Sequence, residues 1–453
     1  MAASARASAA PPAERRLGPT WSRRAPPLAG KAPRPPPKNR VADTSAISFP
    51  ACKNHIVTRR CAAMSEQLLA EFEAMVGRWS ETEAKAWYAQ QPWVMGCNFT
   101  PSTTINQLEM WQAATFDINA IRAELALAAD AGMNAVRIYL HDLLWAEDSQ
   151  GFLNRIDKVL AVAEGYGIRV MLVLFDSCWH PDPELGPQPT PKPGVHHSGW
   201  VPSPDIPALR DPAQRPRLEA YIKGVVNRFR NDRRVLAWDI WNEPENGPEV
   251  SLCDAGELGA KADLVLPLLV DAFGWARSMR PVQPLTSAIW LSDWSSPDLL
   301  TPLQQAQTGL SDVISFHTCG TAGDFAQRIA WLSVFGRPMW CTAFMARPAG
   351  STFEAILAVA KQKHVGAFCW GLLHGKTQAH LPWAAWDDPH LAGLKDKWFH
   401  DIFDVGGVLF DDTEVDFPGL LRTLDAKAPH WPIIGVEVGK ERPNASDGSA
   451  KAA

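Results

Sequence analysis

The feature that most limits how this chain can fold is an alternation of apolar, strand-like runs and amphipathic helices, repeated eight times from about residue 93. The runs that we predict as strands are 93–98, 134–140, 168–175, 235–241, 284–290, 312–317, 338–342 and 365–371. The third run, IRVMLVLF, is apolar without interruption, which is typical of parallel strands buried on both faces. Eight consecutive units favour a closed (β/α)₈ barrel of the α/β class, the TIM barrel, over an open doubly wound sheet.

Local signals predict where some of the helices begin and end. Asp117 precedes a helical apolar stripe, so a helix is expected to begin there and to stop at Gly132. Ser351 and Glu354 have the spacing of a capping box, which predicts that the helix after the seventh strand begins at Ser351.

The two ends of the chain differ in composition from its middle. Residues 1–63 hold 12 Lys and Arg against 2 acidic residues, and ten of the 38 prolines lie in the first fifty positions. Such a segment cannot bury enough apolar surface to fold. We therefore predict a disordered extension over 1–63, a barrel over 64–440 and a disordered tail over 441–453. The extension has no apolar core of a signal peptide, so a cytoplasmic protein is expected, with targeting to an organelle by the Arg-rich segment left open.

Charge and hydropathy exclude several classes of partner. Outside the extension, 32 basic residues face 47 acidic ones, whereas binding to phosphate backbones needs a basic face. The longest apolar runs are shorter than the 18 residues that a membrane span needs. The chain also lacks the G-x-G-x-x-G and G-x-x-x-x-G-K-[ST] fingerprints of nucleotide sites. We expect a monomer without a nucleic-acid or membrane partner and without a cofactor.

Metal sites have equally little support in the sequence. The eight cysteines form no C-x-x-C pair, and His141-Asp142 and His196-His197 lack the spacing of metal ligands. A metal-dependent barrel hydrolase therefore stays a minor alternative.

Polar and aromatic residues gather where the predicted strands end. In a (β/α)₈ barrel, the carboxyl ends of the strands meet at the rim that carries the active site. The residues at these ends are Asn98, Arg137, Asp176, Asn242, Glu243, Trp290, His317 and Trp370. The chain has 20 Trp against 4 Tyr, and flat indole faces can stack on the apolar faces of sugar rings. The pattern predicts a Trp-lined, polar cleft for a glycan.

The end of the fourth strand carries a family resemblance. The run WDIWNEP at residues 238–244 resembles the strand-four signature of clan A glycoside hydrolases, in particular the cellulase-like family 5. The resemblance implies that Glu243 is the general acid/base, that Asn242 hydrogen-bonds the sugar 2-hydroxyl, and that the substrate is a β-linked glucan, mannan or xylan. Trp241 and Pro244 are expected to wall Glu243 and to raise its pKa towards neutrality.

Other strand ends match the family less completely. Arg137 matches the strand-two Arg that supports the nucleophile, His317 matches the strand-six His, and Trp370 matches the platform under the scissile sugar. Asp176 is expected to join these substrate-binding residues. The Tyr that the family usually has two residues after the His is replaced here by Cys319.

The match to the family breaks at the seventh strand. Retaining glycosidases need a second carboxylate about 5 Å from the first, and family 5 places it as a Glu at the end of this strand. Here that position is Ala343, and the sequence has no Asp or Glu between Asp324 and Glu354. The expected nucleophile position is therefore vacant.

Three accounts of the vacancy stay open at this point. The chain could be a catalytically inactive, carbohydrate-binding barrel. It could hydrolyse by inversion, with Glu243 as the acid and Asp176, Asp293 or Glu245 activating water across a wider gap. Or a carboxylate from a loop could take the nucleophile's place.

Overall fold

The computed structural model describes residues 77–178, 182–246, 255–383 and 398–411. The predicted extension, the predicted tail and both boundaries of the predicted barrel domain lie outside these residues, so the domain limits remain predictions.

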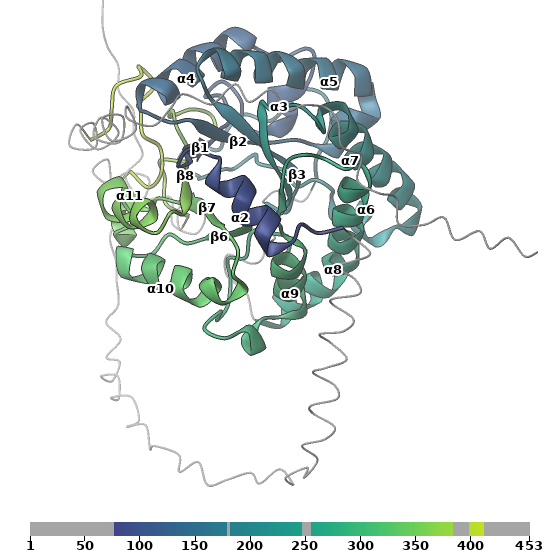
Figure 1. Cartoon of the computed structure of the whole chain (residues 1–453). Coiled ribbons are helices and arrows are strands. Elements are labelled where there is room, and N and C mark those ends of the chain that lie inside the picture. The colour runs from purple at the N-terminus through teal and green to yellow at the C-terminus, as the bar shows by residue number, and fades with distance from the viewer. Residues whose placement is uncertain (1–76, 179–181, 247–254, 384–397, 412–453) are drawn as a thin grey trace, which may run out of the picture. The chain divides into compact units, whose positions relative to one another are not determined.

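Eight parallel strands form the centre of the molecule, which confirms the predicted (β/α)₈ barrel (Figure 1). They are β1 (Met95–Asn98), β2 (Ala135–Tyr139), β3 (Arg169–Asp176), β4 (Val235–Asn242), β5 (Leu285–Thr286), β6 (Ile314–His317), β7 (Met339–Phe344) and β8 (Gly366–Trp370). Hydrogen-bonded neighbours follow the order β5-β4-β3-β2-β1-β8-β7-β6. The circle closes between β5 and β6 by single contacts: the amide of His317 donates to the carbonyl of Ile289 at 2.9 Å.

The fifth strand is shorter than the predicted 284–290. It pairs regularly with β4 only at Leu285 and Thr286. At the next residue, Ser287, the amide donates to the side-chain oxygen of Ser311 at 3.1 Å, and the hydroxyl donates to the carbonyl of Trp241 at 2.9 Å. These side-chain bonds replace the regular ladder, because hydroxyl groups compete with backbone partners.

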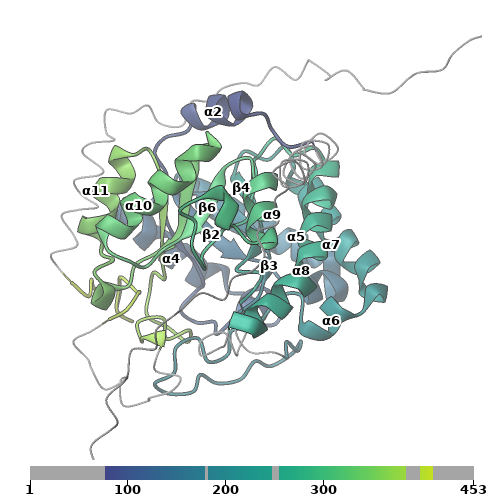
Figure 2. The same cartoon turned by 90° about the horizontal axis from the view of Figure 1, so that it is seen from below.

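Helices surround the strands and complete the barrel (Figures 1 and 2). They are α2 (Glu81–Ala89), α3 (Gln107–Trp111), α4 (Ile118–Asp130), α5 (Asp142–Gly165), α6 (Ile206–Arg210), α7 (Arg215–Phe229), α8 (Ala255–Ser278), α9 (Pro302–Leu310), α10 (Ala322–Leu332) and α11 (Phe353–Gln362). Short 3₁₀ turns occur at Pro212–Gln214, Pro297–Leu299, Ser333–Phe335 and Arg347–Ala349. Among the described residues, none of the helices is both long and apolar enough to cross a membrane.

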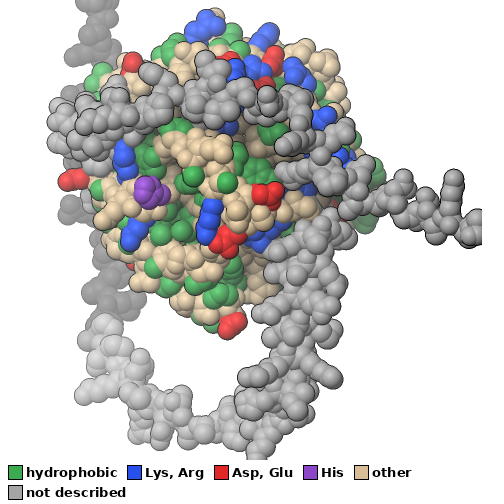
Figure 3. Space-filling model, viewed as in Figure 1, with side chains coloured by type: hydrophobic (Ala, Val, Ile, Leu, Met, Phe, Trp, Pro, Cys, Tyr) green, Lys and Arg blue, Asp and Glu red, His purple; other side chains and the backbone are tan. Residues whose placement is uncertain are grey.

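Helix α2 covers the amino-terminal end of the barrel (Figure 1). The hydroxyl of Tyr88 donates to the carbonyl of Met339 at 3.1 Å and accepts from the amide of Gly366 at 3.0 Å, so it joins the starts of β7 and β8. Trp87 and Tyr88 pack on an apolar cluster at this end of the barrel, around the buried Trp340. This end of the molecule carries basic and acidic side chains side by side (Figure 3). Side-chain packing closes this amino-terminal end of the barrel. The carboxyl-terminal rim, at the opposite end, is therefore the place for a site.

The helix-start predictions had different outcomes. Asp117 is the N-cap of α4 and accepts from the amide of Ala120 at 3.1 Å, as predicted. The predicted capping box at Ser351 is wrong, because Thr352 caps α11 by accepting from the amide of Ala355. Ser351 instead turns back and accepts from the amide of Met345 at 3.1 Å. The side chain of Ser351, which the spacing predicts as the cap of the helix, therefore bonds to the neighbouring loop instead.

The approach of β1 to β2 provides a test of the barrel packing. A Cβ added at Gly96 would lie 2.2 Å from the carbonyl oxygen of Ala135 on the paired strand. We expect Gly96→Ala to lower the free energy of unfolding by about 3 kcal/mol, because the clash is with backbone and cannot be relieved by a side-chain rotation.

The matched control is Gly274→Ala in α8, where an added Cβ meets nothing within 4 Å. It should be neutral or raise the free energy of unfolding by up to about 1 kcal/mol, because alanine favours helix. Urea unfolding of both variants measures the difference. Equal stabilities of the two variants would contradict the described register.

Candidate functional site

Residues from several strand ends line one cleft at the carboxyl-terminal rim, with a volume of about 510 Å³. The predicted site residues that it brings together are Asn242, Glu243, Trp290, His317, Ala343 and Trp370. The loops add Cys178, His196, Asn246, Trp383 and His400 to the same walls. A cleft of this size and aromatic lining is typical of small-molecule and sugar sites.

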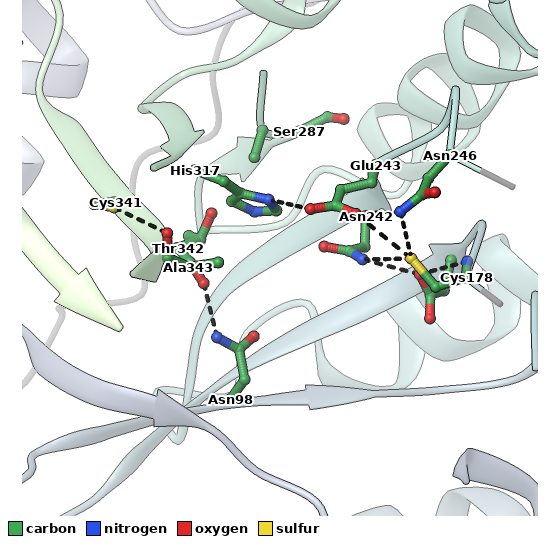
Figure 4. Close-up of polar contacts among 12 residues, drawn as sticks. Asn98, Cys178, Asn242, Glu243, Asn246, Ser287, His317, Cys341, Thr342 and Ala343 are labelled. Carbon is green, nitrogen blue, oxygen red and sulfur yellow. Dashed lines mark hydrogen bonds and ion pairs between the residues drawn. The ribbon is translucent and has the colours of Figure 1, made fainter. Parts of the chain in front are cut away.

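Glu243 occupies the centre of the polar contacts in this cleft (Figure 4). Its Oε1 lies 2.8 Å from Nδ1 of His317, and its Oε2 accepts from Nδ2 of Asn246 at 2.6 Å and from the thiol of Cys178 at 3.5 Å. Its backbone has a φ of +45°, in the left-handed region that a non-glycine residue rarely adopts. Such strain persists where the surrounding structure holds a residue in place, and it is common at functional sites.

The charge state of Glu243 differs from the sequence-based expectation. Burial raises its pKa, but the hydrogen bonds from His317, Asn246 and Cys178 together lower the pKa below its ordinary value. The predicted upward shift of the pKa is therefore wrong, and Glu243 is an ionised carboxylate near neutral pH. Since a carboxylate only accepts hydrogen bonds, Nδ1 of His317 carries the proton between them.

A bulge in β7 places His317 opposite Ala343. Phe316 pairs with Cys341, but the next residue, His317, pairs with Ala343, so Thr342 is the extra residue. Bulges re-aim side chains and occur often beside active sites. The result is that the ring of His317 points to Glu243 from β6, while Ala343 lines the cleft on the neighbouring strand (Figure 4).

Arg137 lies beneath the cleft and is fully buried. Its Nε and Nη2 donate to one oxygen of Asp239 at 3.0 and 2.7 Å, and Nη2 also donates to Oδ1 of Asn242 at 2.8 Å. The Nδ2 of Asn242 in turn donates to Asp176 at 2.9 Å. Both ends of the Asn242 amide are therefore bound, which fixes its orientation at the cleft wall.

Like Arg137, two further predicted substrate-binding residues, Trp241 and Asp176, lie away from the cleft surface. Trp241 is fully buried in the core around the barrel, against Phe175, and its indole nitrogen donates to the hydroxyl of Ser177. Successive residues of a strand point to opposite faces, so Trp241 faces away when Asn242 faces the cleft. Asp176 is also fully buried beneath the cleft, where it accepts from Asn242 and from the amide of Cys178, so it can act on a ligand only through residues that line the cleft.

Trp370 lines the cleft and is held by the aromatic residues behind it. Its ring lies 5.8 Å from that of Tyr139 and 5.4 Å from that of His197, and its indole nitrogen donates to Nε2 of His197 at 3.2 Å. Burial lowers the pKa of His197 well below its ordinary value, so its neutral ring can accept this bond. The predicted platform is thus rigid and aromatic.

The carboxylates proposed for inversion are poorly placed for it. Asp176 accepts hydrogen bonds from Gln107, Trp200 and Asn242 in the interior. Neither Glu245 nor Asp293 lines the cleft. Glu245 is buried, and Asp293 accepts from the amide of Ser295.

One carboxylate besides Glu243 does line the cleft, that of Asp324. It accepts from the amide and hydroxyl of Thr321 at 3.0 and 2.7 Å, as part of the capping box of α10. One of its oxygens, Oδ2, is therefore engaged in capping the start of α10.

The histidine pairs considered as metal ligands have local partners instead. His141 caps α5 by accepting from the amide of Leu143, and Nδ1 of His196 lies 2.9 Å from the carbonyl of Leu381. Within the described part of the chain, no group of three or more His, Cys, Asp or Glu side chains could hold a metal ion.

Several cleft residues had no place in the sequence-based site. Asn246 follows Glu243 in the same turn, where its amide donates to the Glu243 carbonyl at 2.8 Å, so its spacing was a usable signal. Cys178 comes two residues after β3, in a loop for which the sequence predicts no role in the site. His400 and Trp383 are brought in by loops after β8, and nothing in their local sequence indicates this.

Glu245 provides a test of the burial around the site. Burial raises its pKa to about 7, from an ordinary value of 4.5. Between these pH values the folded protein binds more protons at this site than the unfolded chain, so the free energy of unfolding falls as the pH rises through this window. We expect Glu245→Gln to lose less stability than the wild type across the same window, by roughly 1–3 kcal/mol. Urea unfolding at a series of pH values measures this, and parallel curves for the two proteins would contradict it.

Comparisons with known proteins agree with this architecture. Residues 96–262 match the family model described as cellulase (glycosyl hydrolase family 5). Among curated proteins, none matches the chain. Similar solved structures include a GH5_18 protein from Streptomyces cattleya in complex with Manβ1-4GlcNAc (14% identity, 75% of this chain, 82% of that chain, TM-score 0.49). Another is an exo-β-1,4-mannosidase from Opitutaceae bacterium strain TAV5 (17% identity, 76% of this chain, 61% of that chain, TM-score 0.45). A third is a β-mannanase from the blue mussel Mytilus edulis (16% identity, 68% of this chain, 93% of that chain, TM-score 0.44). The match over residues 96–262 supports the predicted resemblance to the cellulase-like glycosyl hydrolase family 5.

Proposed function

We propose that this protein is a glycoside hydrolase for β-linked glycans, with Glu243 as its acid/base and with the nucleophile position vacant at Ala343. The observation that carries the proposal is the carboxylate of Glu243, which three donors hold in an aromatic cleft that Ala343 also lines. Trp290, Trp370 and Trp383 give this cleft flat apolar faces on which sugar rings can stack.

The roles of Glu243 follow from the chemistry of retaining hydrolysis. In the first step a nucleophile attacks the anomeric carbon while the acid/base protonates the departing oxygen, and in the second step the same residue deprotonates the incoming water. An ionised Glu243 suits the second step directly. For the first step it must take up a proton, so activity towards poor leaving groups should favour the acid side of neutrality.

The first step also needs a group that attacks. Among the described residues that line the cleft, Asp324 is the carboxylate besides Glu243, and its Oδ2 accepts two hydrogen bonds from Thr321 in the cap of α10. Within the described part of the chain, this supports a vacant nucleophile position over the inverting account and over a replacement from a loop.

The second candidate is a carbohydrate-binding barrel without turnover. Ala343 favours it, because an alanine can neither attack nor hold charge. Binding and turnover must therefore be measured separately.

An external anion tests whether the site lacks only its nucleophile. We expect purified protein to release dinitrophenol from a β-glucoside, β-mannoside or β-xyloside only when sodium azide is present. Azide attacks the anomeric carbon in place of the missing carboxylate, dinitrophenolate leaves with the bond electrons, and an α-glycosyl azide forms. Dinitrophenolate needs little help from an acid, so the ionised state of Glu243 does not prevent the reaction.

The other outcomes of this experiment separate the two candidates. Strong release without azide would mean that another group attacks, and our account of the vacancy would be wrong. A folded protein that binds oligosaccharides but releases nothing in either condition would favour the binding barrel.

Restoring the carboxylate is a second test. We expect Ala343→Glu to release dinitrophenol without azide, with an increase over the wild type of at least about 100-fold, because losing a nucleophile typically costs several powers of ten in rate. Ala343→Gln is the matched control, since it adds the same bulk without a charge. Equal rates for the two variants would count against Ala343 as the nucleophile position.

The role of Glu243 is tested with a change of leaving group. We expect Glu243→Gln to slow the azide reaction of a poor leaving group by about 100-fold or more, while dinitrophenol release changes little, because general acid–base catalysis contributes on this scale. Glu354→Gln, an exposed carboxylate of α11, is the control. If Glu243→Gln leaves both glycan binding and turnover unchanged, Glu243 is not the acid/base.

A further inference from the structure

A guanidinium group that none of the roles above uses lines the same cleft as Glu243. It belongs to Arg328, one helical turn after Asp324 on α10. Its Cζ lies 4.2 Å from the ring centroid of Trp294 and 5.9 Å from that of Trp331. Stacking on the fully buried Trp294 fixes the plane of the guanidinium and restricts where its N–H groups can point.

Arg328 has no partner for its charge among the described residues. It makes no ion pair and no hydrogen bond there, and its Nη1 is buried without an acceptor. Burial also lowers the pKa of Arg328, although not enough to remove its charge. Buried donors are almost always paired, because leaving one unpaired destabilises the folded protein, so the unpaired Nη1 of Arg328 needs an explanation.

The two nearby carboxylates are engaged elsewhere. Asp324 accepts from the amide and hydroxyl of Thr321 in the capping box of α10. Asp293 accepts from the amide of Ser295. Each attracts Arg328 through space, yet neither lies within ion-pair distance of it. Among the described residues that line the cleft, Arg328 is therefore the one arginine or lysine, and burial keeps His196 and His400 neutral.

We propose that the glycan bound in this cleft carries an anionic group, a uronic acid carboxylate or a sulfate ester, and that Arg328 binds it. The inference rests on the proposed function, since it assumes that a glycan occupies the cleft. A planar guanidinium can donate two parallel hydrogen bonds to a carboxylate or sulfate, and such charge-assisted bonds are about twice as strong as neutral ones. Because Glu243 is ionised in the same cleft, the anionic group belongs at the wall formed by α10 and away from Glu243.

The test compares oligosaccharides that differ only at C6. The probes are a β-1,4-linked glucuronic acid oligosaccharide, the glucose oligosaccharide of the same length, and its 6-O-sulfated form. Their dissociation constants are measured with the full-length protein by calorimetry. We expect at least one anionic probe to bind about tenfold more tightly than the neutral one, and the better of the two identifies the group as carboxylate or sulfate.

Variants then assign the preference to one residue. We expect Arg328→Gln to bring the ratio of anionic to neutral affinity close to one, while the dissociation constant for the neutral probe changes by less than about twofold. Arg328→Lys keeps the charge but loses the planar fork, and should keep part of the preference. Arg122→Gln, an exposed arginine of α4, is the control and should keep all of it. Thermal unfolding shows whether the loss of stacking on Trp294 has affected folding, and Arg328→Lys provides the test if Arg328→Gln is unstable.

The outcomes distinguish this inference from the function on which it rests. Binding of the neutral probe without any preference for the anionic ones, or a preference that survives in Arg328→Gln, would overturn the role of Arg328 and leave the glycan cleft intact. Failure of all three probes to bind the folded wild-type protein would overturn both.

Discussion

The buried ion pair between Arg137 and Asp239 is the interaction on which the site depends. It joins β2 to β4 inside the barrel, and the same guanidinium also donates to Asn98 on β1 and to Asn242 at the end of β4. Both charged side chains are fully buried. Breaking such a pair by removing one partner typically costs about 3–5 kcal/mol, because the remaining charge stays buried. The hydrogen bonds of one arginine thus link β1, β2 and β4, and the linked residues form the floor of the cleft.

The carboxylate of Glu243 is positioned on that floor. Asn242 is bound at both ends of its amide, by Arg137 and by Asp176, so the backbone leaves β4 in a defined direction. The next residue, Glu243, has a positive φ and points across the cleft to His317. His317 owes its own place to the bulge in β7. Strain at one residue is therefore supported by hydrogen bonds on several strands, which is how a fold maintains a prepared site.

The eight strands and the position of the cleft could be predicted because they depend on local patterns. Uninterrupted apolar runs predict buried parallel strands, and the rule that their carboxyl ends meet places Asn242, Glu243 and His317 together. The wrong predictions concern side chains that have more than one possible partner in the folded chain. Ser351 binds the loop before α11 and leaves its capping to Thr352. Trp241 points into the outer core because successive side chains of a strand point to opposite faces of the sheet. The run WDIWNEP by itself does not indicate which face Trp241 takes.

By itself the sequence determined the barrel, the identity of the strand-end residues and the absence of a carboxylate at Ala343, since each follows from residue type and order along the chain. Only the tertiary structure decided the charge state of Glu243, because the donors that lower its pKa come from β6, from the loop after β3 and from its own turn. It also decided that Arg328 lines the cleft without an ion-pair partner among the described residues, because Asp324 and Asp293 accept hydrogen bonds from their own turns instead. Electrostatics depends on distances through space, and these exist only once the strands have closed into a barrel.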